Sequence, residues 1–151
     1  AGDGRIGKIV GKGAEEGRRL KNNFMEGMPA FAKLEKAVKK AAKRGHILSL
    51  DGRTVKVRSS HAALNTLLQS TGSILCAKWV TLINDKIKEE GLDATIIAWV
   101  HDEVQVAVKE GQEEHVGNLA RRMAQKAGEA YQFRIPIDAE YSIGRTWADT
   151  H

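Results

Sequence analysis

The sequence predicts an α+β fold: a helical first part, then a small antiparallel sheet with helices packed on it. Two observations support this prediction. Apolar residues recur at helical spacing through 1–45 and again through 60–90, whereas 46–58 and 96–108 show the alternating period of strands. The chain has 151 residues, of which 42% are hydrophobic and 28% charged, which is typical of one globular domain.

The first part should contain three helices. Residues 1–10 are glycine-rich with apolar positions at helical spacing, which predicts a short helix and a turn. A second helix is expected over 14–26. Pro29 then occupies a position where a first-turn proline is tolerated, and the third helix runs to Arg44 with Gly45 as its C-cap.

The second part begins with a hairpin, because Asp51-Gly52 separates two apolar runs. The remaining predicted elements are a long helix from Ser60 to about Glu90, a strand pair over 96–108, a helix from Gln112 to Ala130 and a last strand over 133–144. The apolar face of the long helix is predicted to hold Leu64, Leu67, Leu68, Thr71, Ile74 and Leu75.

Charge is divided unevenly along the chain. Residues 1–60 hold 15 Lys/Arg against 6 Asp/Glu, a net of +9, and residues 61–151 hold 9 against 13, a net of −4. A basic half indicates a polyanionic partner, and the alternative is a set of solvated lysines on helix faces.

The composition also bears on the compartment. Cys76 is the only cysteine, so no intramolecular disulfide can form, and its apolar neighbours predict a buried thiol. No apolar run approaches the length of a membrane span, and the N-terminus has no signal-peptide core. Cytoplasm is expected (the host's cytoplasm if a phage encodes the chain), with no membrane partner. P-loop, CxxC and HExxH patterns are absent from the sequence.

Three polar residues, His101, Asp102 and Glu103, stand between the two predicted strands. A turn accepts Asp for ordinary reasons. A hard cation such as Mg²⁺ or Mn²⁺ is the alternative reason for two carboxylates there, with Asp102 the better direct ligand and Glu103 the weaker one. Both reach one metal only if the turn breaks the strand alternation.

A second set is formed by His61, Asn65 and Gln69, which are spaced four apart in the long helix. Such a stripe can contact a ligand that lies along the helix. The polar flank of an ordinary amphipathic helix has the same spacing.

Taken together, these stretches resemble family A, the DNA polymerase I family. "WVHDEVQV" resembles its last polymerase motif, and "LDGRTVKVRSSHAALNTLLQSTGSILC" resembles the segment along its palm helix. "AGDGRIGKIVG" resembles the segment directly after the nucleotide-binding fingers helix, and "SIGRTWADTH", with Gly144, Trp147 and His151, resembles the usual C-terminus. The likeness covers essentially the whole chain and is greatest to replicative polymerases of short-tailed phages.

The resemblance implies roles for individual residues. Asp102 matches the carboxylate that binds the catalytic metals, Glu103 its supportive acidic neighbour, and His101 a residue beside the primer end. Asn65 and Gln69 match minor-groove contacts near the newest base pairs. His61 stands where bacterial members commonly have Arg, and Arg53 matches a basic residue near the DNA backbone.

The implied reaction is template-directed nucleotidyl transfer to a primer 3′ hydroxyl, with two Mg²⁺ ions (Mn²⁺ as a substitute). Primer-template DNA and deoxynucleoside triphosphates would be the partners. Residues 1–45 would form the end of the fingers, and 46–151 a portion of the palm.

One part of the pattern is missing. The family needs a second metal-binding Asp on an earlier strand, and no Asp of this chain has that context. The triphosphate-binding fingers helix has no counterpart either. We therefore expect a C-terminal portion of a polymerase that is inactive alone, needs an N-terminal polymerase polypeptide, and self-associates when isolated. The alternatives are a non-catalytic nucleic-acid-binding module derived from a polymerase, and a Mg²⁺-dependent nuclease, which lacks further suitable carboxylates.

Overall fold

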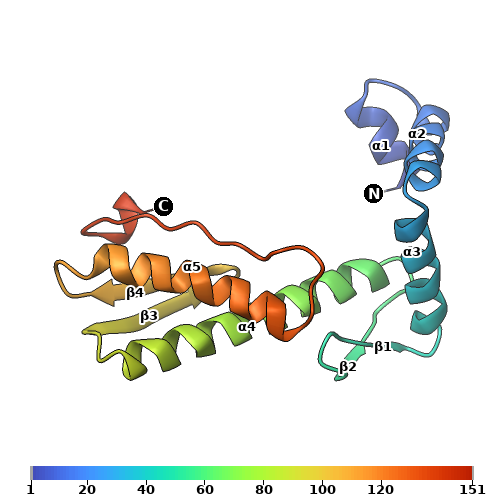
Figure 1. The fold of residues 1–151 in the computed structure, drawn as a ribbon. Helices are drawn as coiled ribbons and strands as arrows, with labels where there is room; N and C mark the ends of the chain where they lie inside the picture. The colour runs from blue at the N-terminus through green and yellow to red at the C-terminus, as the bar shows by residue number, and fades with distance from the viewer. Residues whose placement is uncertain (1, 151) are drawn as a thin grey trace. The chain divides into compact units, whose positions relative to one another are not determined.

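The computed structural model describes residues 2–150, which form two compact units (Figure 1). The first contains the chain up to Ile47 together with Thr54–Leu67. The second contains Leu48–Arg53 together with the residues from Leu68 onward. Among the described residues, no helix is long and apolar enough to cross a membrane.

Three helices build most of the first unit: α1 (Asp3–Ile9), α2 (Ala14–Gly27) and α3 (Pro29–Ala42). All three predicted helices are thus confirmed. Pro29 stands in the first turn of α3, where its missing N–H leaves no hydrogen bond unmade. The helix ends at Ala42 with Lys43 as its C-cap, two residues before the predicted end at Arg44. Gly45, with a φ of +81°, is therefore not the C-cap but lies in the turn that leads into the next element.

Two glycines let α1 and α2 cross in backbone contact. A Cβ added to Gly17 would lie 1.9 Å from the carbonyl oxygen of Asp3, and one added to Gly7 would lie 2.1 Å from that of Gly13. Any larger residue would force the helices apart, so the glycine-rich start of the sequence is needed for packing.

The predicted hairpin is confirmed as β1 (His46–Leu48) paired with β2 (Thr54–Lys56). Gly52 has a φ of +82° in its turn, which only glycine adopts without strain. Strand and helix residues of the first unit share one buried cluster: Val38, Ala42, Ile47, Val57 and Ala63.

The long helix, α4 (Ala63–Glu89), begins three residues later than predicted. His61 therefore lies in the turn before α4 rather than on it. The predicted leucine face is also wrong at Leu68, which is 55% exposed. Leu67 packs against the cluster of the first unit, and its sequence neighbour points about 100° away around the helix.

In the second unit a two-stranded antiparallel sheet, β3 (Ala94–Val100) and β4 (Glu103–Val108), packs against two helices. These are the end of α4 and α5 (Glu113–Ala130). The predicted strand pair and the predicted last helix are confirmed. The core of this unit is made by Ile83, Ile87, Leu119 and Met123, with Trp79, Leu82, Leu92, Ala94, Ile96, Val106 and Ala120 packed against it.

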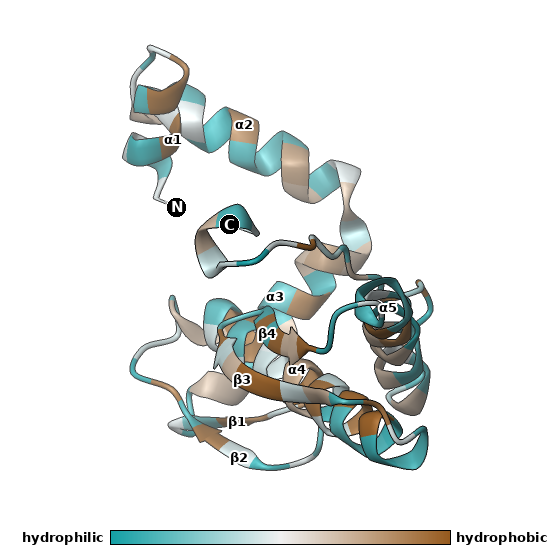
Figure 2. Cartoon of the chain, turned by 90° about the vertical axis from the view of Figure 1, so that its left-hand side faces the viewer, coloured by the Kyte–Doolittle hydropathy of each residue, from teal (hydrophilic) through white to brown (hydrophobic). Residues whose placement is uncertain are grey.

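Apolar side chains remain uncovered on the sheet. Ile97 is 65% exposed, and Trp99 and Val100 are exposed as well. Figure 2 shows the apolar character of β3. Because the sheet has two strands, each strand also keeps one edge without a partner strand among the described residues.

The predicted last strand over 133–144 is wrong: this segment has no regular secondary structure and pairs with no strand. It runs back along α5 instead (Figure 1). Asp138 accepts two hydrogen bonds from Arg121 of α5, at 2.9 and 2.7 Å, and Tyr141 is bound to the same helix. Ile137 lies against Gly128 and the Tyr141 ring against Gly117 of that helix, whereas Ile135 and Ile143 are exposed. Pro136 also has no N–H to give to a ladder.

The chain then makes a short 3₁₀ turn, η1 (Trp147–Asp149). The Thr146 N–H and hydroxyl both donate to the Asp149 carboxylate at 2.8 Å, which closes a capping box. His151 lies outside the described residues.

Candidate active site and nucleic-acid interface

The His101-Asp102 turn joins β3 to β4 directly, since Val100 pairs with Glu103. His101 has a φ of +55°, a left-handed conformation that is uncommon for residues other than glycine. The Trp99 indole N–H donates to the carbonyl oxygen of His101 at 2.8 Å. The tryptophan that leads into the turn therefore holds its backbone.

The two carboxylates follow this left-handed residue in consecutive positions. Asp102 is exposed at the turn, and Glu103 is half-buried at the start of β4. The side-chain amide of Gln105 donates to Glu103, which fixes one oxygen of that carboxylate. The left-handed His101 interrupts the alternation of side chains between the two faces of the strand, just before Asp102 and Glu103. Such an interruption is needed if both carboxylates are to reach one metal ion.

These two acids alone do not form a complete metal site. Within residues 2–150, no group of three or more His, Cys, Asp or Glu side chains is arranged to hold a metal ion. Carboxylate oxygens suit a hard cation, so the donors of Asp102 and Glu103 fit Mg²⁺ in kind.

Cys76 of α4 lies close enough to the turn for the Asp102 carboxylate to affect its thiol electrostatically. Burial raises the pKa of the Cys76 thiol, and the Asp102 carboxylate raises it further. The predicted full burial is wrong, because the thiol is half-buried. With its pKa raised, it stays protonated at neutral pH.

Arg53 lies at the tip of the β1–β2 hairpin with its side chain 69% exposed. Its guanidinium is bound to Asp51, and this contact lowers the pKa of the Asp51 carboxyl to about 2. The hydrogen bond from Ser49 adds to this effect.

The predicted polar stripe is only partly formed. Asn65 and Gln69 are exposed one turn apart on α4, with the exposed Leu68 beside them, while His61 precedes the helix. The stripe thus presents two amides and one apolar side chain.

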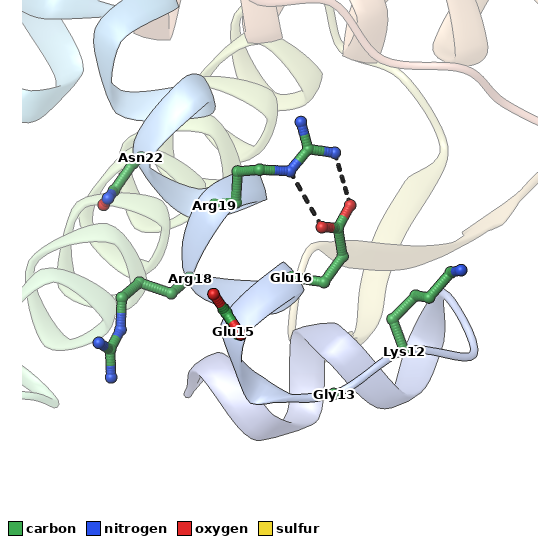
Figure 3. Close-up of a pocket in the computed structure, with 7 residues that line it drawn as sticks. All are labelled: Lys12, Gly13, Glu15, Glu16, Arg18, Arg19 and Asn22. Carbon is green, nitrogen blue, oxygen red and sulfur yellow. Dashed lines mark hydrogen bonds and ion pairs between the residues drawn. The ribbon is translucent and has the colours of Figure 1, made fainter.

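A shallow pocket lies where the loop after α1 enters α2 (Figure 3). Three cationic side chains line it, but Arg19 is already bound to Glu16 at 2.9 and 2.6 Å. Glu15 adds a second negative charge. The pocket is therefore close to neutral, and the basic excess of the first half lies elsewhere.

The decisive comparison is with models of protein families. Residues 18–149 match the model of DNA polymerase family A. The chain belongs to this family.

Curated relatives agree with the assignment. This family A chain is 39% identical to the DNA-directed DNA polymerases of Enterobacteria phage T3 and Escherichia phage T7, over 100% of its own length and 25% of theirs. It is 30% identical to that of Escherichia phage Phieco32, again over its whole length and 26% of the relative. The chain thus spans about a quarter of the length of these relatives.

A solved structure shows the same fold. The polymerase domain of Pol1 from M. smegmatis, in complex with a DNA primer-template and dNTP, superposes with a TM-score of 0.87 and 21% identity. The match covers 99% of this chain and 28% of the other. The α+β prediction is confirmed.

Two side chains that support the predicted site residues of this family A chain were missed in the sequence. Gln105 binds Glu103, and Asp51 binds Arg53, each across a separation of two positions. The first follows from strand periodicity, because residues two apart share one face. The contact of Asp51 with Arg53 was not predicted, because the preference of aspartate for turns already accounted for Asp51 at this position.

Proposed function

We propose that this chain is a portion of a DNA-directed DNA polymerase that supplies part of the site for nucleotidyl transfer to a primer 3′ hydroxyl. The observation that carries the proposal is the carboxylate-bearing turn, Asp102 and Glu103, in a chain of family A. In this proposal residues 1–45 belong to the fingers and 46–151 to the palm, and the polymerase acts in the cytoplasm.

Asp102 would be the direct metal ligand, with Glu103 as a weaker ligand oriented by Gln105. Bound Mg²⁺, or Mn²⁺ in its place, would lower the pKa of the primer hydroxyl and stabilise the charge on the leaving oxygens. The contribution of this chain is to hold two carboxylates on a turn whose backbone is fixed by Trp99. His101 would lie beside the primer end.

DNA would be contacted by Asn65 and Gln69 in the minor groove, with His61 nearby in sequence and Arg53 on the backbone. Minor-groove acceptors are shared by all correct base pairs, so two amides can test pair shape without reading sequence. Deoxynucleoside triphosphates would be the second substrate.

A complementary N-terminal polypeptide would supply the second metal-binding Asp and the nucleotide-binding helix. Two observations support this: the relatives are about four times as long, and β3 exposes Ile97, Trp99 and Val100 beside an unpaired strand edge. Uncovered apolar surface with free edges favours association. We therefore expect the isolated chain to be inactive and to self-associate.

A non-catalytic nucleic-acid-binding module is the second candidate, and the incomplete set of metal ligands favours it. It predicts DNA binding that persists without Mg²⁺ and no nucleotide addition with any partner.

Primer-template binding by the isolated chain should weaken steeply with salt. Its affinity should fall about tenfold between 50 and 200 mM KCl for every two phosphates neutralised. Fluorescence anisotropy of labelled DNA measures this. Changing Lys36 and Lys40 of the basic half to Gln should reduce the salt slope, whereas the matched change of Lys86 and Lys88 should not. An affinity that is insensitive to salt would contradict the DNA role of the first half.

A further inference from the structure

The tip of the β1–β2 hairpin is organised around one carboxylate. Asp51 Oδ2 accepts hydrogen bonds from Arg53 Nε and Nη2, at 2.7 and 2.5 Å. Asp51 Oδ1 accepts from the Ser49 hydroxyl at 2.9 Å and from the Arg53 backbone N–H at 3.3 Å. One side chain thus binds both the backbone and the guanidinium of Arg53.

The backbone around this carboxylate is also held in place. The Ser49 N–H donates to the Arg53 carbonyl at 2.9 Å, and the Gly52 N–H donates to the Ser49 carbonyl at 3.0 Å. Ser49 is buried, whereas the Asp51 side chain is 22% exposed and that of Arg53 is 69% exposed. A fixed base therefore carries an exposed cationic group.

The guanidinium keeps unused donors in this arrangement. Arginine has five N–H groups in a planar fork. Asp51 engages the edge formed by Nε and Nη2. The edge formed by the two terminal nitrogens can still bind an anion in the bidentate way that suits a phosphate.

We propose that Asp51 is a positioning residue that holds the Arg53 guanidinium so that its outer edge binds a backbone phosphate of DNA. This inference rests on the proposed DNA-binding function. A freely moving arginine would lose side-chain entropy on binding, and Asp51 removes much of that cost before DNA arrives. The carboxylate opposes the phosphate by its charge, but this repulsion is screened at an exposed hairpin tip.

The two effects of Asp51 predict opposite results for Asp51→Asn. If Asp51 only repels DNA, the variant binds primer-template more tightly. If Asp51 positions Arg53, the variant binds about three- to tenfold more weakly, with a nearly unchanged salt slope because Arg53 keeps its charge. Arg53→Gln should also bind more weakly, with a slope smaller by roughly 0.9.

A double-mutant cycle on the 151-residue chain tests the proposal by fluorescence anisotropy. In the Arg53→Gln background, Asp51→Asn should cause no further loss of DNA affinity, because Asp51 then has no arginine to position. Asp138→Asn is the matched control, since it breaks a similar Asp–Arg pair, with Arg121. It should not weaken binding. Thermal melts of every variant confirm the fold.

Tighter or unchanged binding by Asp51→Asn overturns the positioning role, as does a loss that persists without Arg53. If Arg53→Gln binds DNA as tightly as the wild-type chain, Arg53 makes no phosphate contact and the proposal is wrong. Salt-independent binding of the wild-type chain contradicts the proposed DNA function instead. A parallel titration with dATP identifies the phosphate source: if Asp51→Asn weakens dATP binding and leaves DNA binding intact, the proposal is wrong.

Discussion

Replacing Asp102 with Asn should abolish nucleotide addition by the assembled polymerase while leaving the fold of this chain intact. A bound metal contributes several kcal/mol of transition-state stabilisation, and each ~1.36 kcal/mol corresponds to a factor of ten in rate. Loss of the main ligand should therefore slow addition about 1,000-fold or more. Single-turnover primer extension measures the effect.

Asp93→Asn is the matched control, because Asp93 is an exposed aspartate at the other end of β3. It should extend primers at the wild-type rate. Thermal melting curves with and without Mg²⁺ show whether the Asp102→Asn substitution changes the stability of the fold rather than the reaction rate alone. Adjacent Asp102 and Glu103 repel each other without metal, so Asp102→Asn should leave the metal-free melting temperature unchanged or raise it. A large destabilisation would indicate a structural role for Asp102.

Truncating Leu119 to Ala should destabilise the second unit severely. Leu119 of α5 is completely buried, in the cluster that α5 forms with α4 and the sheet. A Leu→Ala change at such a site leaves a cavity and costs about 3 kcal/mol or more. Leu68→Ala makes the same chemical change at a residue that is 55% exposed, and it should cost less than about 1 kcal/mol. Urea unfolding measures both, and equal losses would contradict the described core.

Local sequence rules were sufficient for most elements of the fold. Pro29 marks the start of α3 because its fixed φ suits a first helical turn, and Gly45 marks the turn after it because glycine accepts a positive φ. Asp51-Gly52 marked its hairpin for the same reason, since Gly52 adopts a positive φ. These signals depend on the residues themselves and not on distant contacts.

Errors arose where distant contacts decide the structure. The alternation in 133–144 matches a strand, but Asp138 and Tyr141 bind α5, so the segment follows a helix. Leu68 fits an apolar helical face by spacing, yet it stays 55% exposed. The spacing of apolar residues identifies which face of a helix or strand is apolar. It does not identify the element that packs on that face.

The candidate site could be predicted only in part. His101, Asp102 and Glu103 alone also fitted an ordinary turn, and the resemblance to family A favoured a metal site. The left-handed backbone of His101 has no strong sequence signal. Strand spacing places Gln105 on the same face as Glu103, whereas the contact of Asp51 with Arg53 depends on side-chain conformations that spacing does not determine.

The central claim is that this chain supplies one part of a shared polymerase site, and a reconstitution experiment tests it most directly. The chain is mixed with a polypeptide that carries the second metal-binding Asp and the nucleotide-binding helix, and a stable complex is verified by size-exclusion chromatography. Single-nucleotide addition to a primer-template is then followed with Mg²⁺. We expect extension only when both polypeptides are present, and none from the Asp102→Asn complex. A stable wild-type complex that adds no nucleotide would contradict the account and leave the nucleic-acid-binding module.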